Sequence, residues 1–240
     1  MRLPYTPHPP PLSTHPADPI TAALLARRAP RPLQPLDLTL LHSPPVALGW
    51  NSFLGAIRTE TTLAADIREI AICRVAVLNG AAYEWAHHAV LMEGAGVGGR
   101  ARGSVLGVRV GGWGVREEGG EGEEGVEGDG EGVEEGGREG KGEGKGEGDG
   151  DGKGGWGLDE RQVAVLRYTD AMTVGCRVPD EVFAELKRLF SDKEVVEITA
   201  TVAAYNCVSR FLVALDVGEM NGKEVGRQEG EEVEGEASGH

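Results

Sequence analysis

Two helical patterns joined by a short corner constrain this sequence more than any other feature. Between Leu63 and Leu78, apolar side chains recur at the spacing of an α-helix, with Thr62 placed as its cap. A second helical pattern covers 82–93, and Asn79-Gly80 separates the two. Helices joined by so short a connection lie antiparallel and in contact. The sequence therefore predicts a helical hairpin over 63–93.

The rest of the patterned chain also favours helix. Further helices are expected to begin near Pro19, Leu36, Pro44, Leu158 and Pro179, and a last long one after Ser191. Asp159 is the expected cap of the helix that follows it. The helix from Pro44 should bury one apolar side, made of Val46, Leu48, Trp50, Phe53, Leu54 and Ile57. Strand patterns are absent, so we expect an all-α fold of seven or eight helices.

A stretch rich in Gly and Glu interrupts these patterns. Residues 111–157 hold 22 Gly, 15 acidic and 5 basic residues, and residues 217–240 hold 7 acidic and 2 basic residues. The two stretches carry the whole formal net charge of −15. Such segments bury too little apolar surface to offset the entropy of ordering them. We therefore expect a long disordered insert over 98–157 and a disordered acidic tail over 217–240.

The folded part is then a single helical domain made of 19–97 and 158–216, preceded by an extended Pro-rich arm over 1–18. Its 169 residues outside the two acidic stretches are formally neutral, which argues against a nucleic-acid partner. No apolar run reaches the length of a membrane span, so no membrane partner is expected. Three cysteines without a close pair fit a reduced, cytoplasmic protein.

Proton-transfer chemistry is the first functional interpretation of the hairpin. Glu84 and His88 stand four residues apart and share a helix face, and the corner brings Glu69 towards them. An imidazole titrates near neutral pH, and a carboxylate can orient it or exchange its proton. Tyr83 adds a hydroxyl. The plainer alternatives stay open: Glu84 with His88 as a surface pair, and Glu69 with its neighbour Arg68 as a structural ion pair.

Other polar residues are weaker candidates. Cys73 lies in an apolar stretch and is either a buried small side chain or a redox thiol. On the last helix, a polar face that meets a partner could be formed by Tyr205, Asn206 and Arg210. The alternative for Arg210 is a pair with a structural carboxylate. A metal site is not expected, because the adjacent His87 and His88 do not point to one ion and no further ligand clusters with them.

The hairpin residues carry a family resemblance. The segments 68–76 (REIAICRVA) and 82–88 (AYEWAHH) resemble the carboxymuconolactone decarboxylase family, which includes the alkyl hydroperoxide reductase D (AhpD)-like proteins. Segments at 158–162, 166–171 and 206–211 are similar to fungal members. The resemblance implies an AhpD-like helical bundle that assembles into a homo-oligomer, a trimer or hexamer, with sites near subunit contacts.

The AhpD-like branch is matched only in part. Its members carry Cys-x-x-Cys followed by His, and a Glu in a proton relay. On this chain that Glu falls on Glu69 and that His on His88, whereas the two cysteines fall on Ala81 and Glu84. Because a thiolate is the nucleophile in peroxide reduction, the disulfide cycle of that branch cannot run here. A peroxidase would need Cys73 or Cys207 as a lone thiol.

The decarboxylase branch is matched better, by Glu84-Trp85-Ala86-His87-His88. The resemblance implies cofactor-free acid/base chemistry, decarboxylation or isomerisation, on a small organic acid or lactone. His88 would exchange the proton, Glu84 would set its charge state, and Arg210 would hold a substrate carboxylate beside Tyr83 and Asn206. The alternatives are an AhpD-like antioxidant peroxidase that uses a lone Cys, and a non-catalytic oligomeric scaffold.

Overall fold

The computed structural model describes residues 1–7, 19–107 and 155–226. Within these residues it contains nine α-helices, one 3₁₀-helix and no strand, so the all-α prediction is confirmed with more helices than the seven or eight expected. The elements are α1 (Pro19–Arg28), α2 (Pro35–Leu40), α3 (Pro44–Thr59), α4 (Ala65–Leu78), α5 (Ala82–Gly94), α6 (Gly99–Gly107), α7 (Glu160–Gly175), α8 (Asp180–Leu189), α9 (Asp192–Leu215) and η1 (Val217–Glu219).

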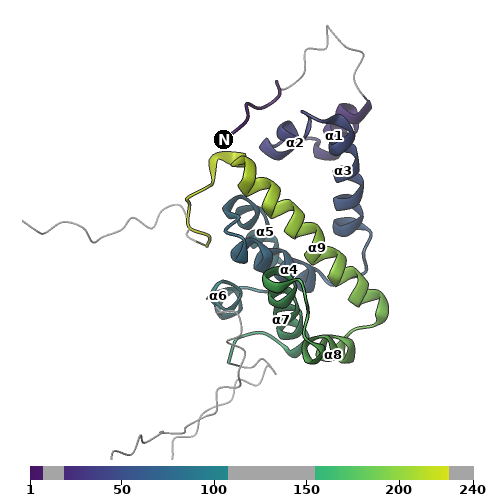
Figure 1. The fold of residues 1–240 in the computed structure, drawn as a ribbon, viewed down its shortest axis with the longest axis vertical. Coiled ribbons are helices and arrows are strands. Elements are labelled where there is room, and N and C mark those ends of the chain that lie inside the picture. Colours follow the sequence, from purple (N-terminus) through teal and green to yellow (C-terminus); the bar gives the residue numbers. More distant parts are fainter. Residues whose placement is uncertain (8–18, 108–154, 227–240) are drawn as a thin grey trace, which may run out of the picture.

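Helix α4 lies at the centre of the molecule (Figure 1) and packs against α5, α6, α7 and α9. All eight residues from Glu69 to Ala76 are buried, so α4 has no solvent face over two turns. A helix enclosed on all sides belongs to the core, even when it carries charged residues. Its buried Arg74 is paired with Asp170 of α7, at 2.5 Å between Nε and Oδ1.

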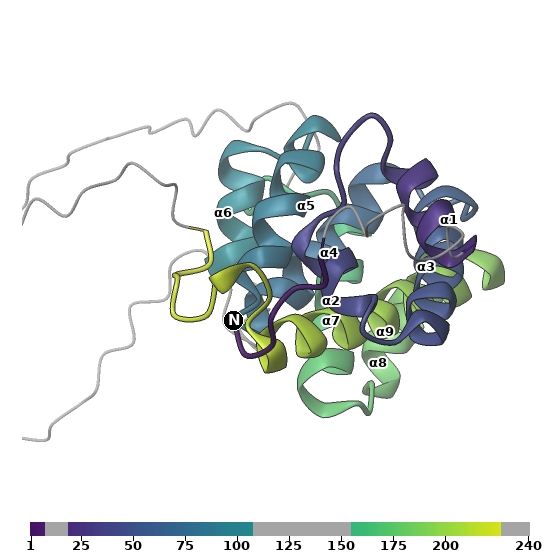
Figure 2. The same ribbon diagram turned by 90° about the horizontal axis from the view of Figure 1, so that it is seen from above.

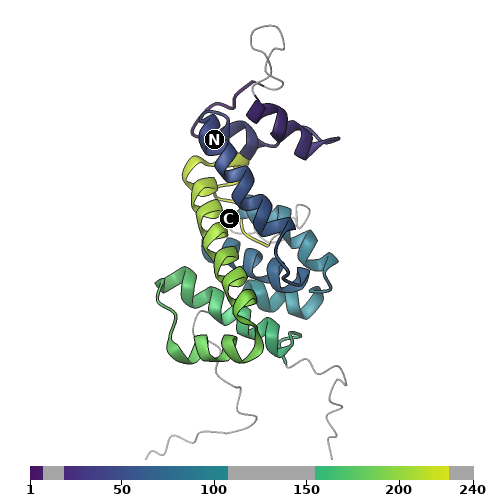
Figure 3. The same cartoon turned by 90° about the vertical axis from the view of Figure 1, so that its right-hand side faces the viewer.

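Helix α9 runs along the length of the molecule (Figure 3) and packs against α3, α4, α5, α7 and α8. Ser191 and Glu194 form the predicted capping box at its start, and Asp159 and Gln162 form a capping box on α7. In length and composition α9 is the one described helix that could cross a membrane, which the sequence analysis did not expect. In this fold it is a core helix, with Ile198, Val202 and Tyr205 fully buried.

The predicted disorder of 98–157 is wrong at its first residues. Residues 99–107 form α6, which packs against α4. Val97, Ala101 and Val105 lie four residues apart, so they share one face, and all three are buried. The guanidinium of Arg74 donates to the Val105 carbonyl at 2.8 Å. The buried apolar side chains and the hydrogen bond from Arg74 explain why a Gly-rich stretch folds there. Residues 108–154 lie outside the described part of the chain.

The predicted disordered tail is also wrong over its first ten residues. Residues 217–226 are described, and Val217 is 2% exposed. The arm at 1–7 lies against this turn (Figure 2): the amide of Arg2 donates to the Leu215 carbonyl, and the Gly218 amide donates to the hydroxyl of Tyr5. Arm and tail therefore order each other through contacts distant in sequence. Residues 8–18 and 227–240 lie outside the described residues.

The prediction for the buried side of α3 is wrong in part, and the predicted cap of α4 is wrong. Leu54 and Ile57 are buried as predicted, together with Ala47, whereas Val46, Leu48 and Phe53 are exposed by 47–49%. Thr62 does not cap α4, which begins at Ala65; its amide and hydroxyl donate instead to Glu197 of α9, at 3.0 and 2.9 Å. Both differences arise because α3 and its following loop are positioned by α9, which local periodicity does not reveal.

Candidate active site

The corner between α4 and α5 positions the candidate site. Gly80 adopts a positive φ of 64°, which glycine tolerates without strain. The Ala81 amide then donates to the Ala76 carbonyl at 2.8 Å, which turns the chain directly into α5. The two helices pack as antiparallel neighbours, as the hairpin predicts. Residues two to three turns from the corner on the two helices are thereby brought together.

Glu69 and His88 are in direct contact. Glu69 Oε2 lies 2.8 Å from His88 Nδ1, and Glu69 Oε1 accepts from Arg68 Nε at 3.2 Å. A carboxylate only accepts, so this contact places the imidazole proton on Nδ1 and leaves the lone pair on Nε2. Nε2 has no hydrogen-bond partner among the described residues and is not fully enclosed. His88 is therefore arranged as a base with a free nitrogen.

Burial sets the charge of His88. Its pKa is lowered from 6.5, chiefly by desolvation; the hydrogen bond and charge of Glu69 oppose this, and the charges of Arg58 and His87 add to it. Desolvation disfavours the imidazolium because a charge is poorly solvated inside the protein. At neutral pH the ring is consequently uncharged and able to accept a proton.

Glu84 does not hold His88, contrary to the role that the resemblance implies for it. The side chain is 2% exposed, and neither carboxyl oxygen has a hydrogen-bond partner among the described residues. Burial raises the pKa of Glu84 well above its ordinary value, and the nearby Arg58 lowers it only in part. The pKa of Glu84 is thus raised and the pKa of His88 is lowered on one face of α5, the opposite shifts expected of an acid and a base.

Two further residues of the site were missed as site residues in the sequence. Tyr205 of α9 is fully buried, and its ring meets the His88 ring edge-on with centroids 5.0 Å apart. Arg58, in the last turn of α3, donates from Nε to the Tyr205 hydroxyl at 2.8 Å. Arg58 and Tyr205 are separated by 147 residues, so spacing along the chain could not have joined them.

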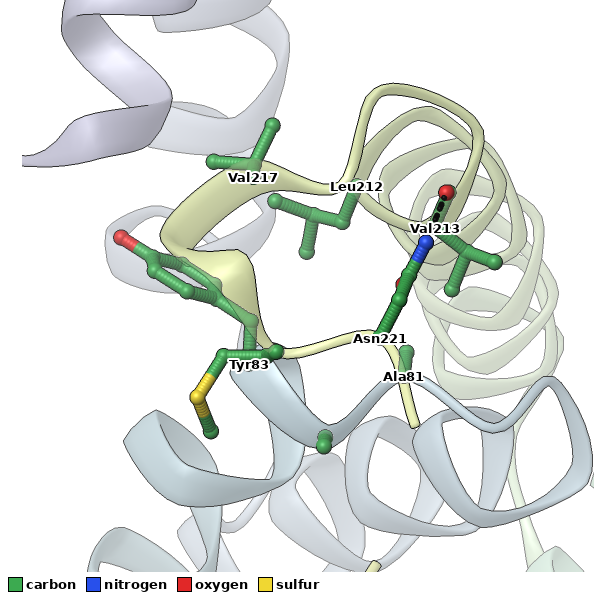
Figure 4. Close-up of a pocket in the computed structure, with 8 residues that line it drawn as sticks. Ala81, Tyr83, Leu212, Val213, Val217 and Asn221 are labelled. Atoms are coloured by element: carbon green, nitrogen blue, oxygen red, sulfur yellow. Dashed lines mark hydrogen bonds between the residues drawn. The ribbon is translucent and has the colours of Figure 1, made fainter. Parts of the chain in front are cut away.

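Tyr83 lies outside this cluster. Its side chain packs beneath the turn that follows α9 (Figure 4), where a Cβ on Gly218 would come within 2.4 Å of the tyrosine ring. The ring also stacks on His87, with centroids 4.3 Å apart. A shallow pocket beside it is lined by small and apolar residues, among them Ala81, Leu212 and Val213, with Asn221 at its edge. Tyr83 is thus a packing residue of the tail.

Asn206 and Arg210 bond to each other rather than to the cluster. The Arg210 guanidinium donates to the side chain and the carbonyl of Asn206. Asn206 also donates to Thr173 of α7 and accepts from Asn79 at the α4–α5 corner. Arg210 is exposed. The pair joins α9 to its neighbours, and the guanidinium whose charge acts on His88 is that of Arg58.

Cys73 is fully buried in α4. Burial strongly raises the pKa of its thiol, and the charges of Glu69 and Glu84 raise it further. A neutral, enclosed thiol is a poor nucleophile. Cys176 and Cys207 are exposed and free. Among the described residues, no group of three His, Cys, Asp or Glu side chains is arranged to hold a metal ion.

Comparisons with known proteins add one structural likeness. No family model matches the chain, and neither does any curated protein. Among solved structures the chain is similar to the crystal structure of a protein of unknown function from Agrobacterium tumefaciens, described as a putative antioxidant defence protein AhpD. The two share 18% sequence identity with a TM-score of 0.49, over 74% of this chain and 92% of the other.

Proposed function

We propose that this chain is a carboxymuconolactone decarboxylase-like enzyme that performs cofactor-free acid/base chemistry, a decarboxylation or isomerisation, on a small organic acid or lactone. The observation that carries the proposal is the Glu69–His88 contact, which leaves Nε2 of His88 free, while burial raises the pKa of Glu84 four residues earlier on the same helix. His88 takes or returns a proton at the substrate carbon. Glu69 fixes the tautomer of His88, and Glu84 is the proton donor.

The peroxidase alternative is less well supported. It needs a thiolate, whereas the thiol of Cys73 is buried and its pKa is raised. A hydroperoxide would also need access to the sulfur, and Cys73 has no exposed surface. A variant with all three cysteines changed to Ala separates the two functions: the acid/base enzyme should retain its turnover, whereas a peroxidase would lose it.

The proposal is tested with a panel of small lactone acids, followed by carbon dioxide release and by substrate absorbance. His88→Ala should abolish turnover, and Glu69→Gln should reduce it because the carboxylate that orients the imidazole is lost. His87→Ala is the matched control, since the His87 side chain bonds only the Tyr83 carbonyl of its own helix. Full activity of His88→Ala would exclude the assignment.

The pH dependence gives a second readout. A base must be deprotonated, so activity should rise with pH through the pKa of His88, which lies below 6.5. An acid must be protonated, so activity should fall again as pH passes the raised pKa of Glu84. Glu84→Gln should lower turnover because the proton donor is lost, and the residual activity should lack the alkaline limb while the acidic limb remains. A profile whose acidic limb persists in His88→Gln would contradict the role of His88.

We also propose that the chain is a homo-oligomer, as the resemblance implies. Apolar side chains stand exposed on two helices, Val46 and Phe53 on α3 and Val90 and Leu91 on α5. Exposed apolar surface of this kind favours association with another protein surface. The mass of the particle in solution, from size-exclusion chromatography with light scattering, should correspond to three or six chains; a single chain would contradict the proposal.

A further inference from the structure

Within the described residues, the guanidinium of Arg58 forms no ion pair with a carboxylate. Every other arginine that is buried or half-buried in the described residues forms an ion pair with a carboxylate: Arg28, Arg68, Arg74, Arg102 and Arg167. Arg58 is half-buried like most of these, yet its single hydrogen bond in the described chain goes to the neutral hydroxyl of Tyr205. The terminal nitrogens of Arg58 are not among the enclosed polar atoms of the described chain, so an anionic ligand can reach them.

Tyr205 holds Arg58 in one orientation. The hydroxyl accepts from Nε at 2.8 Å, and the guanidinium carbon lies 5.8 Å from the centre of the tyrosine ring. Since Nε is engaged, the two terminal nitrogens remain as donors. The pKa of Tyr205 is raised to about 12, chiefly by burial, so the hydroxyl also keeps its own proton. The pair therefore presents several hydrogen-bond donors and no acceptor charge.

These donors lie beside the candidate catalytic groups. The ring of Tyr205 contacts the ring of His88, and the charge of Arg58 acts on both His88 and Glu84. Glu84 forms no ion pair with Arg58 in the described chain, and its two carboxyl oxygens have no hydrogen-bond partner there. Glu69 is already engaged by Arg68 and His88. Within the described residues, neither of these two carboxyl groups is paired with the guanidinium of Arg58.

We propose that Arg58, oriented by Tyr205, binds a carboxylate of the substrate beside His88. The planar guanidinium presents paired donors that match the two oxygens of a carboxylate. This inference rests on the proposed function, and it narrows the substrate class to small acids with a carboxylate that the reaction retains. Arg58 is the binding residue, and Tyr205 is a positioning residue that acts through it.

Binding tests the inference independently of turnover. Calorimetric titration of the full-length protein with malonate, succinate and glutarate should give saturable binding of at least one diacid. The corresponding dimethyl esters should not bind. Arg58→Gln should weaken the diacid about tenfold or more, the scale of a lost charge-assisted hydrogen bond. Arg58→Lys should retain part of the affinity, because the positive charge remains but the paired N–H donors of the planar guanidinium are lost.

The Tyr205→Phe variant tests whether the Tyr205 hydroxyl orients Arg58 for binding, separately from the contribution of the ring to the fold. It keeps the ring against His88 and removes only the hydroxyl, so the protein should stay folded while diacid binding weakens less than in Arg58→Gln. Arg210→Gln is the control, because Arg210 is exposed and bonded to Asn206; it should bind as the parent does. Unchanged diacid affinity in Arg58→Gln, equal binding of acid and ester, or no saturable diacid binding by the parent would overturn the inference. Diacid binding that depends on Arg58 without any turnover would instead refute only the proposed reaction.

Discussion

At the scale of single residues, Glu84 shows most directly how burial changes the pKa of a carboxyl group. Its carboxyl group is enclosed, and neither oxygen is hydrogen-bonded within the described chain. An ionised carboxylate in that position would lose its hydration, and the charge of Arg58 offsets this only in part, so the pKa of the group is raised. A structural role alone would be served better by an apolar side chain. The retention of an unsatisfied acid fits a group that acts on a ligand.

Glu84→Gln should raise the stability of the protein at neutral and alkaline pH. A carboxyl group whose folded-state pKa is raised contributes full stability below its unfolded pKa and loses it as pH rises through the folded value. Because Gln cannot ionise, the stability of the variant does not fall with pH for this reason. Thermal unfolding at pH 8 and pH 4 checks the prediction: the variant should melt above the parent at pH 8, and the difference should shrink at pH 4.

The control for this prediction is Glu69→Gln. Glu69 is bonded to both Arg68 and His88, so its replacement removes two contacts and should lower the melting temperature at pH 8. A lower melting temperature for Glu84→Gln at pH 8 would show that its carboxylate is ionised and stabilising in the folded protein.

At the scale of elements, the helix caps were predicted well because they are local. Asp159 and Ser191 each cap the helix that follows them, through contacts three residues apart. Thr62 failed as a cap because Glu197 of α9 accepts hydrogen bonds from its amide and hydroxyl. The buried side of α3 was misassigned for a similar reason. Periodicity identifies an apolar helix, but the neighbouring helices decide which side is covered.

Ser191→Ala should cost about 1 kcal/mol of unfolding free energy, the usual effect of losing a cap. The Ser191 side chain accepts from the Glu194 amide and donates to the Glu194 carboxylate at 2.8 Å, and α9 spans the whole core. Ser43→Ala is the matched control, because Ser43 precedes α3 without a side-chain cap bond. Denaturant unfolding of both variants measures the difference; equal losses would mean that the Ser191 cap adds nothing.

At the scale of the whole molecule, the long Gly- and Glu-rich segment is flanked by residues that lie together. The Ser104 hydroxyl donates to the Trp156 carbonyl at 2.8 Å, so the chain leaves and re-enters the helical body at one place. A connection whose ends are already close adds little entropy cost with length. The helical body can therefore carry an insertion there without rearranging α4 or α7.

Replacing residues 108–154 with a short Gly-Ser linker should leave the helical structure of the described residues and the number of chains per particle unchanged. The free energy of unfolding should change by less than about 1 kcal/mol, because loop length has a weak effect. Circular dichroism, light scattering and denaturant unfolding measure these quantities. A deletion that begins at residue 99 is the control, because it also removes α6 and the carbonyl that Arg74 binds. Unfolding of the shorter deletion would contradict the prediction.

The sequence by itself determined the helical class, the α4–α5 hairpin and the meeting of Glu69 with His88. The helical repeat and a short corner fix which residues of two consecutive helices face each other, so local rules suffice. Only the tertiary structure decided that α6 folds, that Glu84 is enclosed, and that Arg58 and Tyr205 complete the cluster. These depend on how α3, α4 and α9 pack, and contacts between residues far apart in the chain leave no periodic signal in it.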